Sequence, residues 1–293
     1  MKKTRIVQLT QVLFTIFFLY SSFIYSKPNE SVKIDSTMFK WSPNLIGGLN
    51  FSQIAFGNWT KGGENSFTWS VNGDFKLKYK NEYLTFKTKL KTIYGRTKLD
   101  GKDFKTNEND LYIDQVLSYH ANWKVDPFFS NSIQTQVTTG YEYKAESSEK
   151  VADFFDPAII TQSLGFTYDK LKIVQTRLGL ALQHTITNKY RKYSDNKDTP
   201  AKKEAYKFET GFESVTNAKI KIDENVIAES NLRLFSRFEE IETWDVRWDN
   251  KIVAKINSWL NVSFTYNFII KTSESPKPQM KESLLMGIRY NFI

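Results

Sequence analysis

Two histidines limit the catalytic chemistry open to this chain. His120 follows Ser118 by two positions, and a Ser–His pair is the arrangement that acyl transfer uses. Alternate residues of a strand lie about 7 Å apart, however, which is too far for a hydroxyl–imidazole hydrogen bond. No Gly-x-Ser-x-Gly motif occurs, and His184 stands alone. The sequence therefore predicts a protein that is not an enzyme and has no catalytic residues.

Metal and cofactor ligands are equally scarce. The chain has no cysteine, and its two histidines do not have the spacing of a transition-metal site. The segments 107–110 and 195–198 offer oxygen ligands for calcium, but neither matches an EF-hand loop. Solvated loop charge is the favoured interpretation, so neither a metal nor a cofactor is predicted.

A third group of side chains points to the passage of solutes. Basic residues recur at alternate positions of several segments, so each set is expected on one face of a strand. A cationic cluster in a narrow pore favours anionic solutes. The alternative is that these charges pair with acidic neighbours and fill the interior as a polar core. The candidate lumen residues are Lys76, Lys78, Lys87, Lys89, Lys91, Arg233, Arg237, Arg247 and Lys251.

The elements that carry these charges alternate between apolar and polar residues from Asn44 to the end of the chain. In 67–80 the odd positions are apolar or glycine, and the even positions are Thr, Ser, Asn, Asp or Lys. A period of two is the pattern of β-strands. Twelve strands are predicted, near 44–59, 66–80, 83–95, 110–122, 128–143, 157–168, 172–187, 206–222, 226–239, 243–256, 260–271 and 282–292.

The connections between these strands alternate in length. Short turns are predicted at 81–82, 123–127, 169–171, 223–225 and 257–259, and most of the intervening connections are longer and rich in charged residues. Alternating short turns and long loops are typical of outer-membrane barrels. The turns predict the cross-strand pairs Lys219–Glu229, Trp248–Phe268, Asp74–Lys89 and Phe166–Val174.

The charges of the polar faces separate a membrane barrel from a soluble one. A soluble barrel has a dry interior. If twelve such strands closed around a dry interior with their polar faces inward, roughly twenty or more charges would be buried, which is prohibitive. In a membrane the same charges line water and the apolar faces meet lipid. The predicted fold is all-β: a membrane-spanning antiparallel up-and-down β-barrel of about 12 strands.

The N-terminal segment is predicted to be an export signal. Three basic residues at 2–5 precede an apolar run at 12–20, and Ser26 offers a small residue for cleavage. The clean apolar run is shorter than the roughly 20 residues that span a bilayer. The expected organisation is a signal peptide at 1–26, a short periplasmic segment at 27–43 and the barrel at 44–293.

Composition excludes two other classes of protein. Charged residues make up 25% of the 293 residues and the mean hydropathy is −0.47, which excludes a bundle of membrane-spanning helices. The net charge is +9, and +6 once the three basic residues at 2–5 are removed with the signal peptide. The charges are spread along alternating segments rather than clustered, so no nucleic-acid partner is expected.

One segment carries a family resemblance. Its motif is Ser-Gln at 52–53, Asn58-Trp59, and Gly62-Gly63 followed by Glu-Asn-Ser at 64–66. This pattern resembles the opening of a Gram-negative outer-membrane β-barrel family known only as a domain of unknown function. The resemblance implies a signal peptide and an outer-membrane barrel, and no activity. The glycine pair permits a tight turn.

These observations together predict a passive outer-membrane channel, narrow in bore, for small polar or anionic solutes, with both termini in the periplasm. Its expected partners are outer-membrane lipid, the barrel-assembly machinery and a small anionic solute. Two alternatives remain: a non-conducting structural or interaction barrel with a charge-filled lumen, and a lipid-acting enzyme built on His120. Oligomeric state is left open.

Overall fold

The computed structural model describes residues 40–56, 63–144, 147–171, 173–196, 199, 202–272 and 275–293. All of these belong to one of the two compact units of the chain, Phe39–Ile293. The elements are β1 (Lys40–Ile54), β2 (Ser66–Lys80), β3 (Leu84–Leu99), β4 (Lys105–Tyr119), β5 (Asp126–Thr135), β6 (Gly140–Tyr143), β7 (Ser148–Ala152), β8 (Ala158–Tyr168), β9 (Val174–Ile186), the 3-10 turn η2 (Arg191–Tyr193), β10 (Tyr206–Lys221), β11 (Val226–Arg237), β12 (Trp244–Lys255), β13 (Leu260–Ile270) and β14 (Gln279–Asn291).

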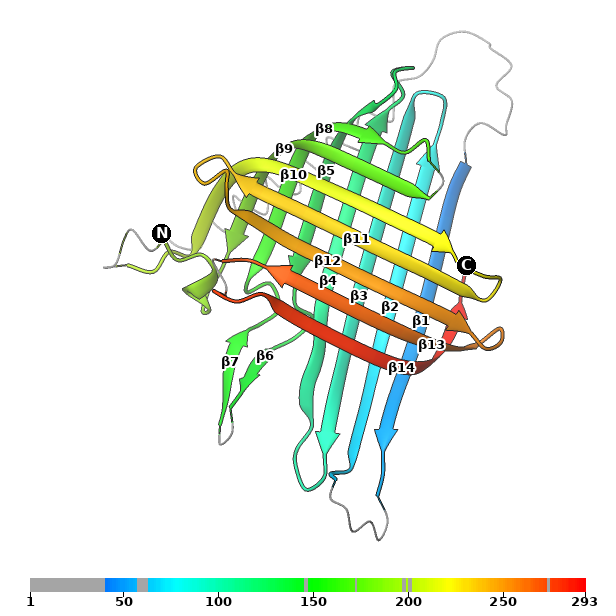
Figure 1. Ribbon diagram of the computed structural model, residues 1–293. Coiled ribbons are helices and arrows are strands. Elements are labelled where there is room, and N and C mark those ends of the chain that lie inside the picture. The colour runs from blue at the N-terminus through cyan, green and yellow to red at the C-terminus, as the bar shows by residue number, and fades with distance from the viewer. Residues whose placement is uncertain are drawn as a thin grey trace. The chain divides into compact units, whose positions relative to one another are not determined.

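Twelve of these strands close into a barrel in which each strand pairs with its neighbours. The order is β1-β14-β13-β12-β11-β10-β9-β8-β5-β4-β3-β2, and every pairing is antiparallel. Closure between β1 and β14 leaves no free sheet edge, which a structure within lipid requires (Figure 1). The predicted strand count and up-and-down fold are confirmed.

Cross-strand register agrees with the sequence for two of the four predicted cross-strand pairs. Lys219 faces Glu229 and Trp248 faces Phe268, as expected. The β2–β3 register was predicted wrongly by two residues, because Asp74 faces Lys91 and not Lys89. Asn81 causes this shift: its Oδ1 accepts hydrogen bonds from the Tyr83 and Leu84 amides, which widens the turn.

The β8–β9 register differs from the prediction by four residues. Phe166 faces Leu178 in place of Val174. The connection is wider because the Ile173 carbonyl accepts a hydrogen bond from the Lys219 amide of β10 and so leaves the hairpin. Both register errors are even numbers of residues, so each side chain keeps its predicted face of the wall.

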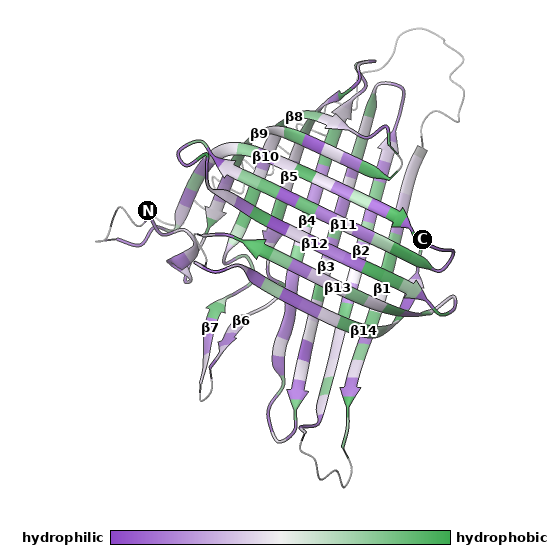
Figure 2. Ribbon diagram, in the orientation of Figure 1, coloured by the Kyte–Doolittle hydropathy of each residue, from purple (hydrophilic) through white to green (hydrophobic). Residues whose placement is uncertain are grey.

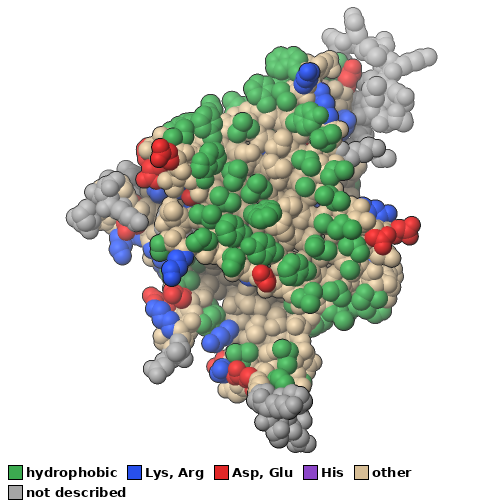
Figure 3. Space-filling view, in the orientation of Figure 1, with side chains coloured by type: hydrophobic (Ala, Val, Ile, Leu, Met, Phe, Trp, Pro, Cys, Tyr) green, Lys and Arg blue, Asp and Glu red, His purple; other side chains and the backbone are tan. Residues whose placement is uncertain are grey.

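The outer surface of the barrel is apolar along alternate residues. In β9, Leu178, Leu180 and Leu182 are 58%, 55% and 43% exposed. Arg177 and Gln183, which flank this run, are buried. Figure 2 shows the alternation along the strands, and Figure 3 shows apolar side chains across the wall with charged ones gathered toward its ends. An apolar band between polar ends is the surface of a lipid-spanning barrel. Among the described residues, no helix is long and apolar enough to cross a membrane.

One predicted strand was wrong. The segment 128–143 divides into β5, which remains in the barrel, and β6, which pairs with β7 as a separate two-stranded hairpin. Asn109 of β4 ends the barrel pairing, because its side-chain oxygen accepts hydrogen bonds from the Val137 and Thr138 amides. The predicted loop at 144–156 therefore contains a strand, and the hairpin lies outside the barrel sheet (Figure 1).

The N-terminal predictions fall largely outside the described residues. The predicted signal peptide and most of the periplasmic segment lie there, while β1 begins at Lys40, ahead of the predicted boundary at 44. Of the four family-motif residues, Asn58, Trp59 and Gly62 also lie outside. Gly63 has a φ of +141°, and a Cβ there would fall 2.5 Å from the Phe56 ring, so this position requires glycine.

Candidate functional site

The lumen has two sides of different character. On the side formed by β5 and β8–β10 many of the inward residues are small, and Gly165 is the extreme case. A Cβ at this position would fall 2.1 Å from the Leu178 carbonyl oxygen, so only glycine lets the two strands approach. Small inward residues leave room for arginines to lie across the interior. We call this side the filled wall.

Arg177 of β9 is the first arginine of the filled wall. Its guanidinium donates two hydrogen bonds to the Asp114 carboxylate across the lumen, at 3.0 and 2.8 Å. Two parallel bonds of this kind fix geometry as well as charge. Arg177 is 6% exposed, so this ion pair is shielded from water and its two strands are held together across the interior.

Two more arginines, both from the neighbouring strand β11, extend over the filled wall and bond carboxylates of β10. Arg233 donates to Glu213, which also accepts from Ser163. Arg237 lies between two carboxylates, Glu209 and Asp245. The buried Phe235 ring lies between the two guanidinium groups, 5.7 and 5.8 Å from them. Paired buried charges of this kind act as a polar core.

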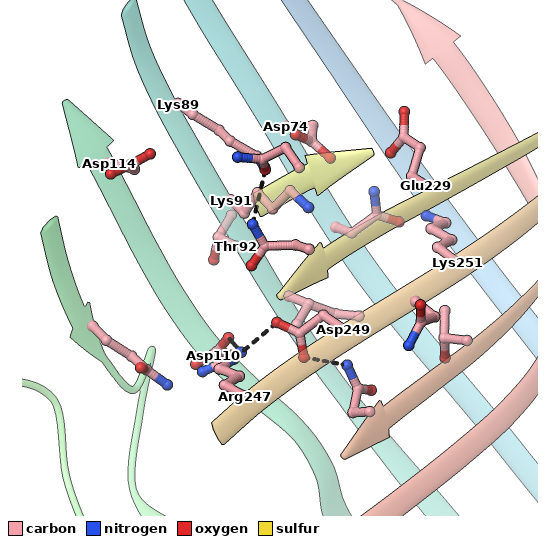
Figure 4. Close-up of a pocket in the computed structure, with 18 of the residues that line it drawn as sticks. Asp74, Lys89, Lys91, Thr92, Asp110, Asp114, Glu229, Arg247, Asp249 and Lys251 are labelled. Atoms are coloured by element: carbon pink, nitrogen blue, oxygen red, sulfur yellow. Dashed lines mark hydrogen bonds and ion pairs between the residues drawn. The ribbon is translucent and has the colours of Figure 1, made fainter. Parts of the chain in front are cut away.

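The other side of the lumen encloses open space. A cavity of about 1070 Å³ is bounded mainly by β1–β4 and β10–β14, with one end against the β6–β7 hairpin. Its lining includes ten lysines and arginines and six carboxylates, a formal net charge of +4. In Figure 4, Lys89 and Lys91 of β3 lie on one side of this space and Lys251 of β12 on the other. The cavity is large enough for a small polar solute.

Five lysines of the cavity lack an acidic partner. In the described part of the chain, none of them makes a side-chain hydrogen bond or an ion pair. The β2–β3 register places Lys76 opposite Lys89, and like charges that face each other destabilise a sheet. Arg247, by contrast, pairs with Asp110 and Asp249 at 2.9 and 2.8 Å. The unpaired lysines are Lys76, Lys78, Lys89, Lys91 and Lys251.

Asparagines form the rest of the polar lining, and sequence reasoning missed them. Asn231 donates to Asn217 at 2.8 Å, Asn267 donates to Asp249 at 2.7 Å, and Asn50 bonds Asn72 at 3.0 Å. Each lies an even number of residues from other inward-facing side chains of its strand, which places it in the lumen. Asparagine is common on any polar face, however, so this pattern did not single them out. Amides supply both donors and acceptors to a solute in the cavity.

The nine candidate lumen residues divide between these two sides. Seven line the cavity: Lys76, Lys78, Lys87, Lys89, Lys91, Arg247 and Lys251. Arg233 lines a smaller space of about 60 Å³ beside it. Arg237 belongs to the filled wall, where Glu209 and Asp245 hold it. The two interpretations of the sequence, open lumen and charge-filled core, therefore apply to different sides of one barrel.

Lys87 is the one cavity lysine of β3 with a counter-ion. It bonds Asp169 of the β8–β9 connection at 3.0 Å. Burial raises the pKa of Asp169, but the Lys87 ammonium outweighs it and holds that pKa below its usual range. This ion pair therefore stabilises the fold at neutral pH, and the stabilisation is lost as pH falls through the lowered pKa.

His120 does not bond Ser118. Its Nε2 lies 2.9 Å from the Thr85 hydroxyl and its Nδ1 lies 3.1 Å from Asp126, whereas Ser118 lines the cavity. The i+2 spacing separates serine from histidine, as the strand geometry predicts. A Ser–His pair is therefore not formed, in agreement with the expectation from the sequence. His184 faces outward, and its Nδ1 lies 2.7 Å from the Tyr206 hydroxyl.

Oxygen and nitrogen ligands do not converge on a cation site within the described residues. No group of three or more His, Cys, Asp or Glu side chains there has the geometry to hold a metal ion. Most lumen carboxylates instead bond arginines or lysines, and Asp74 is an exception in the described part of the chain.

A closed antiparallel barrel with an apolar outer band and a charged lumen is an outer-membrane β-barrel. Residues 51–141 match the model of a family described as "Protein of unknown function (DUF3078)". This match confirms the resemblance that the 52–66 motif indicates to an uncharacterised family. No match was found among curated proteins.

Solved structures with a similar fold include barrels of several kinds. The translocator domain of the autotransporter NalP from Neisseria meningitidis is 7% identical, with a TM-score of 0.35, 89% of this chain covered and 90% of that one. An outer membrane channel from Pseudomonas putida F1 is 11% identical, with a TM-score of 0.36 and coverages of 91% and 98%. Because both scores are below 0.5, the fold assignment rests on the strand pairing and the apolar band.

Proposed function

We propose that this barrel is a narrow passive channel of the outer membrane for small anionic solutes, with the lysine-lined cavity as its selective region. The observation that carries the proposal is the set of five cavity lysines without acidic partners. Like charges held close together lower the stability of the wall. Such an arrangement is typical of a site that attracts a ligand of opposite charge.

The placement of the lysines accounts for selectivity. Lys89 and Lys91 enter the cavity from β3 and Lys251 enters from β12 on the opposite side, so a solute passing between them meets positive charge from both directions. A unit charge about 7 Å away in water changes the free energy of an ion by about 0.6 kcal/mol, or about threefold in local concentration. Several such charges produce a clear anion preference.

Planar-bilayer recording with refolded protein tests this proposal. Under a KCl gradient the wild-type reversal potential should indicate chloride over potassium. The triple variant Lys89→Gln, Lys91→Gln, Lys251→Gln should lower that permeability ratio about threefold or more. A matched control replaces three exposed loop lysines, Lys124, Lys202 and Lys203, with Gln and should leave the ratio unchanged. Cation preference in the wild type contradicts the proposal.

A second candidate function is a non-conducting barrel that contacts other molecules through its outer loops, chiefly 188–205. The filled wall favours it, because three arginines cross the lumen between carboxylates there. The same recordings decide between the two candidates: a folded barrel with no conductance supports the second. Periplasmic termini, contact with outer-membrane lipid and insertion by the barrel-assembly machinery remain predictions of the sequence.

A further inference from the structure

Three amide side chains form a row on the outside of the barrel wall. Gln115 of β4 is the direct cross-strand partner of Asn131 of β5, which is in turn the partner of Gln162 of β8. Cross-strand partners face the same side of a sheet. We call these three residues the amide row.

The immediate neighbours of the row establish that it faces outward. Asp114, next to Gln115, bonds Arg177 within the lumen, and Ser163, next to Gln162, bonds Glu213 there. Successive side chains of a strand point to opposite faces, so the amides face the membrane. The alternating burial of β5, in which Ser130 and Ser132 are buried and Asn131 is partly exposed, agrees with this.

The row lies at the depth of the hydrocarbon. Gln115 precedes Tyr119 by four residues and Gln162 precedes Tyr168 by six, and both tyrosines end their strands at the short-turn rim. At about 3.3 Å per residue along a tilted strand, the amides are well inside an apolar band about 25 Å tall. Apolar residues surround them in the adjacent outward rows: Ile113, Ile133 and Ile160 on one side, and Leu117, Phe129 and Leu164 on the other.

None of the three amides is satisfied within the described part of the chain. No side-chain hydrogen bond forms to any of them there, and the Asn131 Oδ1 atom is buried without a partner. Lipid tails offer no hydrogen bonds, so an unpaired amide in the hydrocarbon is costly.

Some other outward polar groups of the described wall are paired with one another. Trp248 Nε1 donates to the Ser230 hydroxyl at 2.9 Å, and that hydroxyl bonds the Asn250 amide oxygen at 2.8 Å. Thr176 and Thr216 bond each other at 2.9 Å. The Asn250 Nδ2 atom of β12 also has no partner among the described residues, so the distinguishing feature of the amide row is that its three amides are adjacent on neighbouring strands.

We propose that the amide row is the centre of an interface with a second copy of this chain in the membrane. Each amide carries donors and an acceptor, so a row of amides is complementary to an identical row. The surrounding Ile113, Ile133, Leu117 and Leu164 pack against the same residues of the second copy. Side-chain hydrogen bonds between membrane segments favour association in lipid.

The symmetry of this pair follows from the order of the row. Two identical patches meet about a two-fold axis. Asn131 lies between the two glutamines, so the axis passes close to it and each Asn131 faces the Asn131 of the other copy. This interface is independent of the proposed channel function, since it involves the outer wall and not the lumen.

Disulfide cross-linking in intact membranes tests the proposal directly. The chain has no cysteine, so each introduced thiol reports on its own position. Asn131→Cys should form a disulfide-linked dimer under mild oxidation. Phe264→Cys is the matched control, because β13 lies six strands from β5 in either direction around the barrel and its Phe264 is also exposed. Equal cross-linking of both variants, or of neither, overturns the proposal, as does a cross-link to a different protein.

A second variant measures the contribution of the amides. The triple replacement Gln115→Leu, Asn131→Leu, Gln162→Leu should leave heat-modifiable migration, the sign of a folded barrel, unchanged because leucine suits lipid. Light scattering in mild detergent should show dimerisation weakened at least about tenfold, the equivalent of 1.4 kcal/mol. Asn250→Leu, on the other side of the barrel, should retain the dimer. A monomeric wild-type protein contradicts the proposal.

Discussion

At the scale of single residues, the arginines and lysines of the lumen differ in their partners. Arg177, Arg233 and Arg237 each contact one or two carboxylates, whereas Lys89 and Lys91 contact none in the described part of the chain. The planar guanidinium suits fixed ion pairs, while the flexible ammonium suits a charge that must accommodate a moving solute. The arginines of the filled wall are therefore structural, and the five basic side chains of the cavity without an acidic partner among the described residues are all lysines.

Arg237→Met tests the structural side. This change leaves Asp245 and part of Glu209 buried without a counter-ion, and both are below 10% exposed. The loss of one partner from a buried ion pair costs about 3–5 kcal/mol. Urea unfolding in detergent micelles should register a loss of that size in the free energy of unfolding.

Arg289→Met is the matched control for that measurement. Its side chain has no ion pair among the described residues, so its replacement should cost less than about 1 kcal/mol. Equal losses in the two variants would show that the paired arginine contributes no more than an unpaired one.

At the scale of elements, the β6–β7 hairpin stands apart from the barrel. It pairs only with itself as a sheet, and Tyr141 and Val151 line one end of the cavity. Tyr141 was predicted within a barrel strand at 128–143, and the structure places it in the separate hairpin instead. An element that contributes little to the wall but bounds the cavity is suited to narrowing the path of a solute.

Deletion of 141–151, with two glycines joining Gly140 to Ala152, tests this role. The two joined residues are cross-strand partners, so a tight turn can link them. The barrel should fold, because its twelve strands are untouched, and single-channel conductance should rise. Wild-type conductance in this variant would show that the hairpin does not narrow the path of the solute.

At the scale of the whole barrel, connection length predicts sidedness. The turns at 222–225 and 256–259 and the C-terminus lie at one end, and the β3–β4 connection and the β6–β7 hairpin lie at the other (Figure 1). Short turns belong to the periplasm and long loops to the cell exterior in barrels of this kind. The C-terminus is therefore expected in the periplasm.

Epitope insertion checks this orientation. A tag after Asp103, in the β3–β4 connection, should bind antibody on intact cells, and a tag after Glu224, in the β10–β11 turn, should bind only after the outer membrane is permeabilised. Both sites are in exposed connections, so neither insertion should disturb the strands. The reverse labelling pattern would invert the proposed topology.

The sequence by itself determined which residues of each strand face lipid and which face the lumen. Only the tertiary structure decided which lumen charges are paired and which outward residues lie side by side. Period two fixes which residues face lipid, so the strand count and the inward position of Lys89 follow from local pattern. Whether an inward charge has a partner depends on strands far apart in the chain, as Arg177 and Asp114 demonstrate. The amide row likewise appears only when β4, β5 and β8 lie side by side, since no local pattern reveals that Gln115, Asn131 and Gln162 share one level of the wall.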